Sequence, residues 1–438
     1  MVIPVLVRLA AVVILGMAIG PLSFAADSLT LEDALRIAAG RSRQLVAQDA
    51  LASAAREQAV AAGQLPDPVL KLGVANLPVN GPDRLSLTRD FMTMRSVGVM
   101  QEITRGDKLK ARSARFNREA EAAEASRAAA LVNLRRDTAM AWLDRYYQER
   151  MLDVLRTQRA EAGLQIEAAD TAYRGGRGPQ ADVFAARSMV AQMDDRIRQA
   201  EKQVGTAKIK LARWIGDDAS QVLDAAPSQE SVHLDLASLE DQLAHHPQIA
   251  LMTKQEEVAR ADADIAQSNK RSDWTVELMV SQRGPAYSNM VSVNVSVPLQ
   301  WDQKNRQDRE LSAKLAVAEQ MRAQREEATR EHVADTRMWL QEWKSNRERL
   351  AQYDSALIPL SLERTRAAIV AYRGGSGPLT AVLEARRMTI DTQMDRLRLA
   401  METAALWAQL EYLIPVAHPT AVEARTPLLP TTTTATEK

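Results

Sequence analysis

The sequence predicts a mainly helical chain made of two similar halves, each with one β-hairpin, and three observations support this fold class. The motif Tyr-Arg-Gly-Gly-x-Gly-Pro occurs at residues 173–179 and again at residues 372–378. A stretch of about 65 residues without a helix-breaking cluster precedes each copy. Two short regions alternate apolar and polar residues, as half-exposed strands do. Because the copies lie about 200 residues apart, they indicate duplication of a half-chain rather than a short tandem repeat.

The composition excludes several classes of protein. Lysine plus arginine and aspartate plus glutamate number 56 each, which gives no electrostatic reason to expect a nucleic-acid partner. The chain contains no cysteine, so disulfides, thiolate metal sites and a cysteine-linked lipid anchor are excluded. Aromatic residues make up only 4% of the chain. This composition favours long helices that pack through small side chains.

The first 25 residues have the pattern of an export signal peptide. Arg8 supplies a positive charge, residues 9–19 form an apolar run, and Ala25 is a small residue at the expected cleavage position. The run is too short to span a bilayer as a helix, and no later stretch reaches about 18 uninterrupted apolar residues. We therefore expect an exported chain without a membrane-spanning helix.

The first half, residues 26–216, is expected to contain four elements. Ser28 and Thr30 suit the start of the first helix, and Leu65-Pro-Asp-Pro68 ends it. The pattern then changes to a period of two, interrupted by turn residues, which predicts a hairpin. A proline-free stretch predicts a helix of roughly 95–100 Å, and Pro179 suits the first turn of a returning helix. The predicted elements are a helix at 29–64, a hairpin at 67–104, a long helix at 108–172 and a returning helix at 179–215.

The second half, residues 239–414, repeats this order after a linker at residues 217–238. Val291, Val293 and Val295 alternate with polar residues, which is typical of a strand with one apolar face. Residues 415–438 are rich in threonine and proline and are expected to be disordered. The predicted elements are a helix at 239–269, a hairpin at 273–300, a long helix with one proline at 306–371 and a returning helix at 379–413.

The returning helix of the first half carries a coiled-coil pattern. Apolar residues recur every seven positions in two series offset by three, as they do in helices that pack along a partner. We expect this helix to pack against the long helix before the turn. The two series are Val183, Val190, Ile197, Val204 and Leu211, and Ala186, Met193, Ala200, Ala207 and Trp214.

The alternating segments predict membrane strands. Strands of about 9–11 residues with one apolar face cross membranes in closed β-barrels. Four strands are too few to close such a barrel, so several chains would contribute to one barrel. The alternative is that each hairpin packs on the helices of its own half.

These features together resemble the TolC family of outer-membrane efflux ducts. The shared features are the signal peptide, the duplicated halves, the two hairpins and the paired glycine-rich turns. The resemblance implies a homotrimer with a twelve-stranded outer-membrane β-barrel, four strands from each chain, continuous with an α-helical coiled-coil tunnel in the periplasm. It also implies docking to a periplasmic membrane-fusion adaptor and an inner-membrane RND pump. Segments 65–69, 92–102 and 382–387 resemble the branch that serves heavy-metal pumps.

The resemblance places the two turns at the periplasmic tip, where the tunnel narrows and the adaptor docks. Tyrosine and acidic residues beyond the second turn would constrict the aperture, and Tyr372 and Glu384 match them. An aspartate expected near Ala381 is missing, whereas Asp182 occupies the equivalent place in the first half. Asp182 and Glu384 also fit ordinary helix-start charges, which the helix dipole favours. The residues expected at the tip are Tyr173, Gly175, Gly176, Gly178, Tyr372, Gly374, Gly375 and Gly377.

Two further motifs suggest metal ligands less strongly. Adjacent histidines on a helix point apart, so a role at a helix start is favoured for His245 and His246 over a ligand pair. Met92 and Met94 share one face of a predicted strand, and two thioethers suit a soft ion such as Cu(I). Packing or lipid-facing roles are commoner for methionine. We therefore predict no metal site.

A basic cluster marks the start of the first long helix. A solvated collar is the expected role of these side chains, which would lie where the helix leaves the barrel. The cluster consists of Arg105, Lys108, Lys110, Arg112 and Arg115.

The sequence predicts a transport protein and not an enzyme. We expect no catalytic site and no cofactor, because no nucleophile–base set, phosphate-binding glycine loop or catalytic carboxylate pair occurs. The expected function is a passive outer-membrane channel, the exit duct of a tripartite efflux system. Heavy-metal cations such as copper, silver, zinc, cobalt or cadmium are the expected substrates, with drugs as an alternative. A periplasmic coiled-coil adaptor or scaffold without a barrel is the competing prediction.

Overall fold

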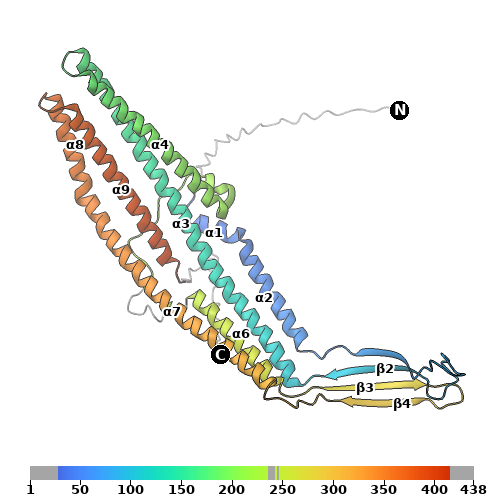
Figure 1. Cartoon of the computed structure of the whole chain (residues 1–438). Helices are drawn as coiled ribbons and strands as arrows, with labels where there is room; N and C mark the ends of the chain where they lie inside the picture. The colour runs from blue at the N-terminus through green and yellow to red at the C-terminus, as the bar shows by residue number, and fades with distance from the viewer. Residues whose placement is uncertain (1–27, 235–241, 244–245, 415–438) are drawn as a thin grey trace, which may run out of the picture.

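The computed structural model describes residues 28–234, 242–243 and 246–414 of the chain. It shows an elongated molecule with one β-sheet at one end and two helical turns at the other (Figure 1). We call these the sheet end and the turn end. The predicted fold class, mainly helical with four strands, is confirmed. The predicted signal peptide, the predicted disordered tail and part of the predicted linker lie outside the described residues.

The four strands form a single antiparallel sheet in the order β1-β2-β3-β4. The two hairpins are joined because β2 pairs with β3, so the alternative in which each hairpin packs on its own helices is wrong. In one row across the sheet, Leu70 lies opposite Val99, Val99 opposite Leu278 and Leu278 opposite Val293. The strands are β1 (Val69–Ala75), β2 (Met94–Ile103), β3 (Trp274–Gln282) and β4 (Met290–Ser296).

One face of this sheet is apolar and uncovered. Because side chains alternate between faces, the register places one series of apolar residues on the same side of all four strands. No helix covers this series, and the outer edges of β1 and β4 pair with no other described strand. The exposed apolar residues of this face are Leu70, Leu72, Val74, Val97, Val99, Ile103, Trp274, Leu278, Val280, Val291, Val293 and Val295.

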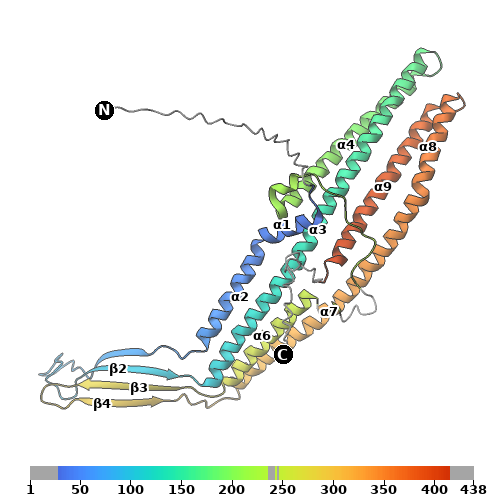
Figure 2. The ribbon, with the colours of Figure 1, turned by 180° about the vertical axis from the view of Figure 1, so that it is seen from behind.

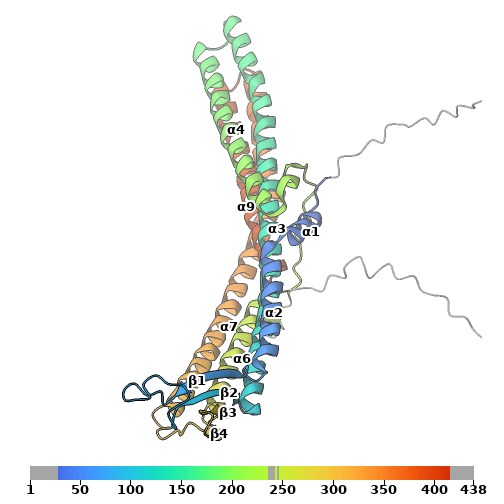
Figure 3. The same ribbon diagram turned by 90° about the vertical axis from the view of Figure 1, so that its right-hand side faces the viewer.

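Four helices continue from the sheet (Figure 3), in the same lateral order as the strands (Figure 1). Each lies next to one strand in the chain, so the order of the strands fixes the order of the helices. The middle pair, α3 and α6, packs side by side, whereas the outer sides of α2 and α7 have no described neighbour. The helices are α2 (Arg43–Ala62), α3 (Gly106–Arg174), α6 (Pro247–Ser268) and α7 (Gln307–Gln352).

At the turn end the helices lie in the order α4, α3, α9, α8, as seen from both sides (Figures 1 and 2). The predicted coiled coil is present: Val183, Met193 and Leu211 of the heptad series are buried as α4 packs along α3. Ile197, Ala200 and Trp214 are only partly buried. The additional elements are α4 (Gln180–Ile215), α8 (Ile358–Arg373) and α9 (Leu379–Glu411).

The predicted helix at 29–64 is two helices, α1 (Leu31–Arg41) and α2, separated at Ser42. Ser42 has an extended backbone conformation, and its hydroxyl oxygen accepts a hydrogen bond from the Leu45 amide at 3.3 Å. A serine that caps the following helix in this way competes with a continuous helix. The break lets α1 lie against the middle of α3 while α2 runs toward the sheet.

We expect the substitution Ser42→Ala to lower the free energy of unfolding by about 1 kcal/mol, because the first turn of α2 loses its capping oxygen. Chemical denaturation of the purified protein, followed by circular dichroism, measures the change. Ser53 lies exposed inside α2 and makes no such cap, so Ser53→Ala is the matched control. Equal stability of the two variants would contradict the capping role.

The predicted helix at 306–371 is interrupted where α3 is continuous. A π-helix, η2 (Tyr353–Leu357), separates α7 from α8. Pro359 lies two residues after the end of this π-helix, in the first turn of α8. Proline has no amide proton and clashes with the preceding turn of an α-helix, so the chain widens its hydrogen-bond spacing just before it.

The largest hydrophobic core lies at the waist of the molecule, between the two ends. Trp142, Trp343 and Trp407 come from α3, α7 and α9 and are at most 5% exposed. The guanidinium of Arg145, 2% exposed, donates hydrogen bonds to the carbonyl oxygens of Ala219 and Gln221, both at 2.7 Å. These two hydrogen bonds hold the short 3-10 helix η1 (Gly216–Ser220) and the residue that follows it against α3.

Candidate functional site

The two glycine-rich turns have the same backbone geometry. Gly176 and Gly375 have φ angles of 67° and 73°, a left-handed conformation that glycine adopts without strain. In each turn the residue after this glycine donates its amide to a carbonyl of the preceding helix, at 2.8 Å from Arg177 and 2.9 Å from Ser376. Such bonds satisfy carbonyls that a helix end leaves free.

The remaining motif residues complete each reversal. Gly175 and Gly374 are the C-cap residues of α3 and α8, and the prolines are the N-cap residues of α4 and α9. A Cβ atom on Gly377 would lie 3.1 Å from the Cβ of Ala371, so the third glycine lets the turn close tightly. The corresponding distance for Gly178 is 3.4 Å.

The two turns pack against each other through an apolar cluster. Ala169, Val183 and Ala186 from the first half are buried with Leu379 and Val382 from the second. Tyr372 is partly buried against this cluster, whereas Tyr173 is 44% exposed. The structure therefore brings the two predicted tip segments together but gives the two tyrosines different surroundings.

The three residues predicted to constrict an aperture lie at the same end of the molecule but do not form a network. Asp182 is half-buried in the first turn of α4, and Glu384 is exposed on α9. Within the described residues, no hydrogen bond joins Asp182, Tyr372 and Glu384. In a single chain, Asp182 fits the ordinary role of a helix-start charge.

Two ion pairs that sequence analysis missed join the two halves near the turns. Arg386 on α9, only 9% exposed, contacts Glu161 on α3 at 2.7 Å. Arg196 on α4 contacts Asp391 on α9 at 2.8 Å. We call these two pairs the cross-links. The arginine at position 386 interrupts the buried face of α9, and a charge within an apolar stripe could have indicated a partner.

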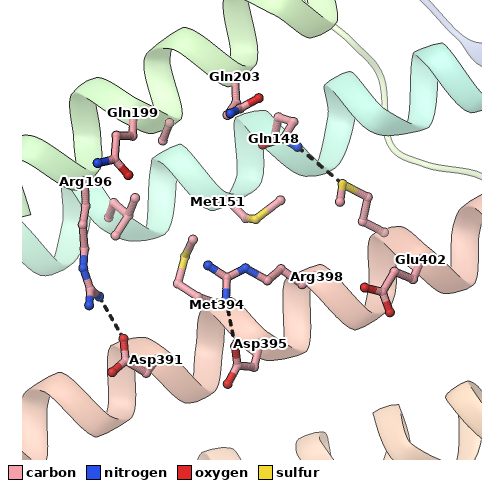
Figure 4. A pocket seen from close by; sticks show the side chains of 13 residues that line it. Gln148, Met151, Arg196, Gln199, Gln203, Asp391, Met394, Asp395, Arg398 and Glu402 are labelled. Atoms are coloured by element: carbon pink, nitrogen blue, oxygen red, sulfur yellow. Dashed lines mark hydrogen bonds and ion pairs between the residues drawn. The ribbon is translucent and has the colours of Figure 1, made fainter.

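A cavity of about 710 Å³ lies between the α3/α4 pair and α9, beside the second cross-link (Figure 4). Arg196 and Arg398 point into it, and each is paired with an aspartate of α9. Its other wall contains Gln148 and Met151 from α3. Because charged, amide and apolar side chains are mixed here, the arrangement fits a groove between two helical pairs and not a catalytic centre.

The histidine motif has the predicted role at a helix start. His246 is the N-cap of α6, and its Nδ1 accepts a hydrogen bond from the Gln248 amide at 3.2 Å, whereas His245 lies outside the described residues. The His246 ring packs on the ring of His332, with centroids 4.6 Å apart. Burial, then the charges of His332 and Arg136, lowers the pKa of His246 to about 4.

We expect the protein to lose stability as the pH falls from about 6.5 toward 4. In this window the unfolded chain binds a proton at His246 that the folded chain does not, so the free energy of unfolding decreases, by about 2 kcal/mol once solvent screening is allowed for. Tm measured at pH 7.5 and at pH 4.5 tests this. His246→Asn keeps a capping oxygen but no titrating ring. Its Tm should fall less than the wild-type Tm, and an equal fall would argue against His246 as the source.

Two expectations are wrong: the shared strand face of Met92 and Met94, and the solvent exposure of Lys108 within the basic cluster. Met94 begins β2, but Met92 lies before the strand, where its amide bonds to the Asp90 carboxylate, so the two do not share a strand face. Lys108 is 6% exposed and lies 2.5 Å from Asp273, so it ties α3 to the start of β3 instead of forming part of a solvated collar. A buried lysine needs a carboxylate partner, and Asp273 lies 165 residues away from Lys108 in the sequence.

Metal-binding clusters and membrane-spanning helices are both absent from the described part of the chain. Among residues 28–234, 242–243 and 246–414, no three histidine or carboxylate side chains gather in a way that could hold a metal ion. None of the helices described there has both the length and the apolar character of a membrane span.

A sequence model described as "Outer membrane efflux protein" matches residues 34–217, which span the first half of the duplication. The first half of the chain is therefore similar to the outer membrane efflux protein family. The match confirms the predicted resemblance to outer-membrane efflux proteins. A comparison with curated proteins found no match.

Solved structures of outer-membrane proteins share the fold of this chain over both halves. VceC from Vibrio cholerae has a TM-score of 0.73 at 17% identity, over 87% of this chain and 95% of VceC. The Campylobacter jejuni CmeC outer membrane channel has a TM-score of 0.73 at 12% identity, over 90% and 88%. The Neisseria gonorrhoeae MtrE outer membrane channel, in its open state, has a TM-score of 0.67 at 18% identity, over 87% and 88%.

Proposed function

We propose that this chain is one subunit of a homotrimeric outer-membrane channel, through which substrates leave the periplasm passively. The observation that carries the proposal is the single four-stranded sheet with an uncovered apolar face and two open edges. In lipid every backbone polar group needs a partner, so the β1 edge of one subunit must pair with the β4 edge of the next. Three copies give a closed barrel of twelve strands.

The helices support the same assembly. The outermost helices expose large apolar side chains that a single chain leaves in water, such as Val60 on α2, Val317 on α7, Ile209 on α4 and Val370 on α8. Exposed apolar surface of this kind marks contacts with other molecules. Neighbouring subunits would cover these edges and close the helices into a tunnel below the barrel.

The turn end would be the periplasmic tip that docks to a membrane-fusion adaptor, itself coupled to an inner-membrane RND pump. The docking residues would be those of the two turns, and Asp182, Tyr372 and Glu384 would narrow the aperture once three copies surround it. An N-terminal signal peptide would direct export, and no lipid anchor would be attached. The docking residues are Tyr173, Gly175, Gly176, Gly178, Tyr372, Gly374, Gly375 and Gly377.

Heavy-metal cations are the proposed substrates, with drugs as the alternative. The metal proposal rests on the resemblance of segments 65–69, 92–102 and 382–387 to the metal-serving branch. Growth of a deletion strain on copper, silver, zinc, cobalt, cadmium and common antibiotics distinguishes the two. Sensitivity to antibiotics alone would contradict the metal proposal.

The channel itself is tested with the purified mature protein. We expect heat-modifiable migration on gels, fractionation with the outer membrane, and discrete conductance steps in planar lipid bilayers. A periplasmic adaptor would instead wash off membranes in salt or urea. A water-soluble monomer that forms no conducting unit would contradict the proposal.

A further inference from the structure

The segment between β4 and α7 forms a rigid elbow at the sheet end. We call residues 299–309 the basic elbow. Gln300 and Gln303 donate side-chain hydrogen bonds to the carbonyl oxygens of Asn269 and Lys270, each at 2.9 Å. These bonds fix the elbow to the connection between α6 and β3, so its exposed side chains project from an ordered backbone.

An exposed tryptophan lies at the start of this elbow. Trp301 is 88% exposed, and Leu299 before it is 66% exposed. Both continue the odd-numbered apolar series of β4, and Trp274 lies 55% exposed at the same end of β3. Tryptophan concentrates at membrane–water boundaries, where one part of the ring meets lipid and its N–H meets water.

Unpaired positive charge follows the tryptophan. Lys304, Arg306 and Arg309 are exposed, and no carboxylate in the described part of the chain pairs with them. The two aspartates of the elbow are occupied: Asp302 accepts hydrogen bonds from Asn305, and Asp308 pairs with Lys270 at 2.8 Å. The elbow therefore presents three free cations.

The start of α7 adds free backbone amides next to these cations, and its first turn also contains the carboxylates of Asp308 and Glu310. Arg306 is the N-cap residue, and its side chain supplies no capping oxygen to the first turn. The N-terminus of a helix carries a partial positive charge and free amides that favour phosphate. By contrast, the loop at the far end of β1 and β2 is balanced, because Arg84 and Arg89 are accompanied by Asp83 and Asp90.

We propose that the basic elbow binds the phosphate headgroup of an anionic phospholipid in the periplasm-facing leaflet, with Trp301 at the headgroup boundary. This inference rests on the proposed membrane barrel. The three cations of the elbow without a carboxylate partner, next to the exposed Trp301, carry it, since Lys and Arg near an anionic lipid surface are attracted within a Debye length. Three copies would place three such sites around the barrel.

Titration of the detergent-purified, delipidated full chain with phosphatidylglycerol or phosphatidylcholine, read by native mass spectrometry, tests this. We expect phosphatidylglycerol to bind at least about tenfold more tightly, with a preference that salt weakens. The variant K304Q/R306Q/R309Q should lose about tenfold in phosphatidylglycerol affinity. The control R84Q/R89Q, at the other end of the sheet, should change by less than about twofold.

A second measurement uses brominated phosphatidylglycerol, which quenches nearby tryptophan. We expect Trp301→Phe to remove a quenched component of the fluorescence. Unchanged phosphatidylglycerol affinity in the triple variant, or an equal loss in the control, would overturn the inference.

Conductance separates the inference from the channel itself. If wild-type protein forms channels but lipid preference does not depend on the elbow, only the inference fails. If wild-type protein forms no channel, the proposed function fails as well.

Discussion

Replacing Arg145 with methionine is expected to lower the free energy of unfolding by about 3 kcal/mol, because two buried carbonyl oxygens lose their donor. Arg145 also pairs with Glu149 at 2.9 Å, so the substitution leaves that carboxylate with only the more distant ammonium of Lys208, at 3.7 Å. Methionine fills a similar volume, and the loss therefore reports the hydrogen bonds more than the packing.

Denaturant titration followed by circular dichroism measures this effect. Arg150 lies on the same helix but is exposed, with its guanidinium over the ring of Tyr146. Arg150→Met should cost less than about 1 kcal/mol. If the two variants were equally stable, Arg145 would not hold η1 against α3 as described.

Breaking both cross-links is expected to open the tip. In the double variant R196A/R386A, α9 loses its two ion pairs to the α3/α4 pair, of which the Arg386–Glu161 pair is the more buried. If the closed arrangement loses about 1.4 kcal/mol relative to the open one, the open population rises about tenfold. We expect a several-fold higher average conductance in planar bilayers.

The matched control is Arg159→Ala. Arg159 pairs with Asp194 at 2.9 Å, but this pair joins α3 to α4 within one helical pair and does not cross to α9. Its conductance should stay near the wild-type value. The charge exchange E161R/R386E keeps an ion pair between α3 and α9, so its average conductance should lie below that of R196A/R386A. If R196A/R386A conducts like the wild-type protein, the cross-links do not hold the proposed tip closed.

The aperture residues proposed from the resemblance give a separate test at the same end. Tyr372→Ala combined with Glu384→Ala should raise conductance if three copies of these side chains narrow the opening. Glu384 is exposed and makes no described hydrogen bond within one chain, so its contribution must come from the assembled ring. Tyr372 also packs on the apolar cluster between the turns, so the single variant Glu384→Ala isolates the contribution of the ring. Unchanged conductance would count against the aperture assignment while leaving the cross-links untouched.

Local patterns predicted most of the helices and strands, because periodicity and turn chemistry act over a few residues. The glycine turns at 173–179 and 372–378 were visible for this reason. The pairing of β2 with β3 was not, since nothing local links Val99 to Leu278. The break at Ser42 was missed because a serine within an alanine-rich helix is compatible with either outcome.

The candidate site shows the same division. The sequence located the two glycine turns, but the partners of Arg386, Arg145 and Lys108 lie far away in the chain, and burial of a charge depends on the whole fold. The role of Met92 was misjudged because the strand begins two residues later, and strand boundaries are set by pairing and not by composition.

The uninterrupted helix α3 sets the distance between the sheet and the first glycine turn. Its 69 residues extend roughly 100 Å at 1.5 Å per residue. The second half matches this span, because α7, η2 and α8 run from Gln307 to Arg373 despite the π-helical turn. Each chain thus contains two helical segments of nearly equal length, which set the distance between the glycine turns and the sheet. A partner that contacts the glycine turns must therefore lie at that distance from the sheet. Inserting seven residues into one segment alone would shift one turn relative to the other.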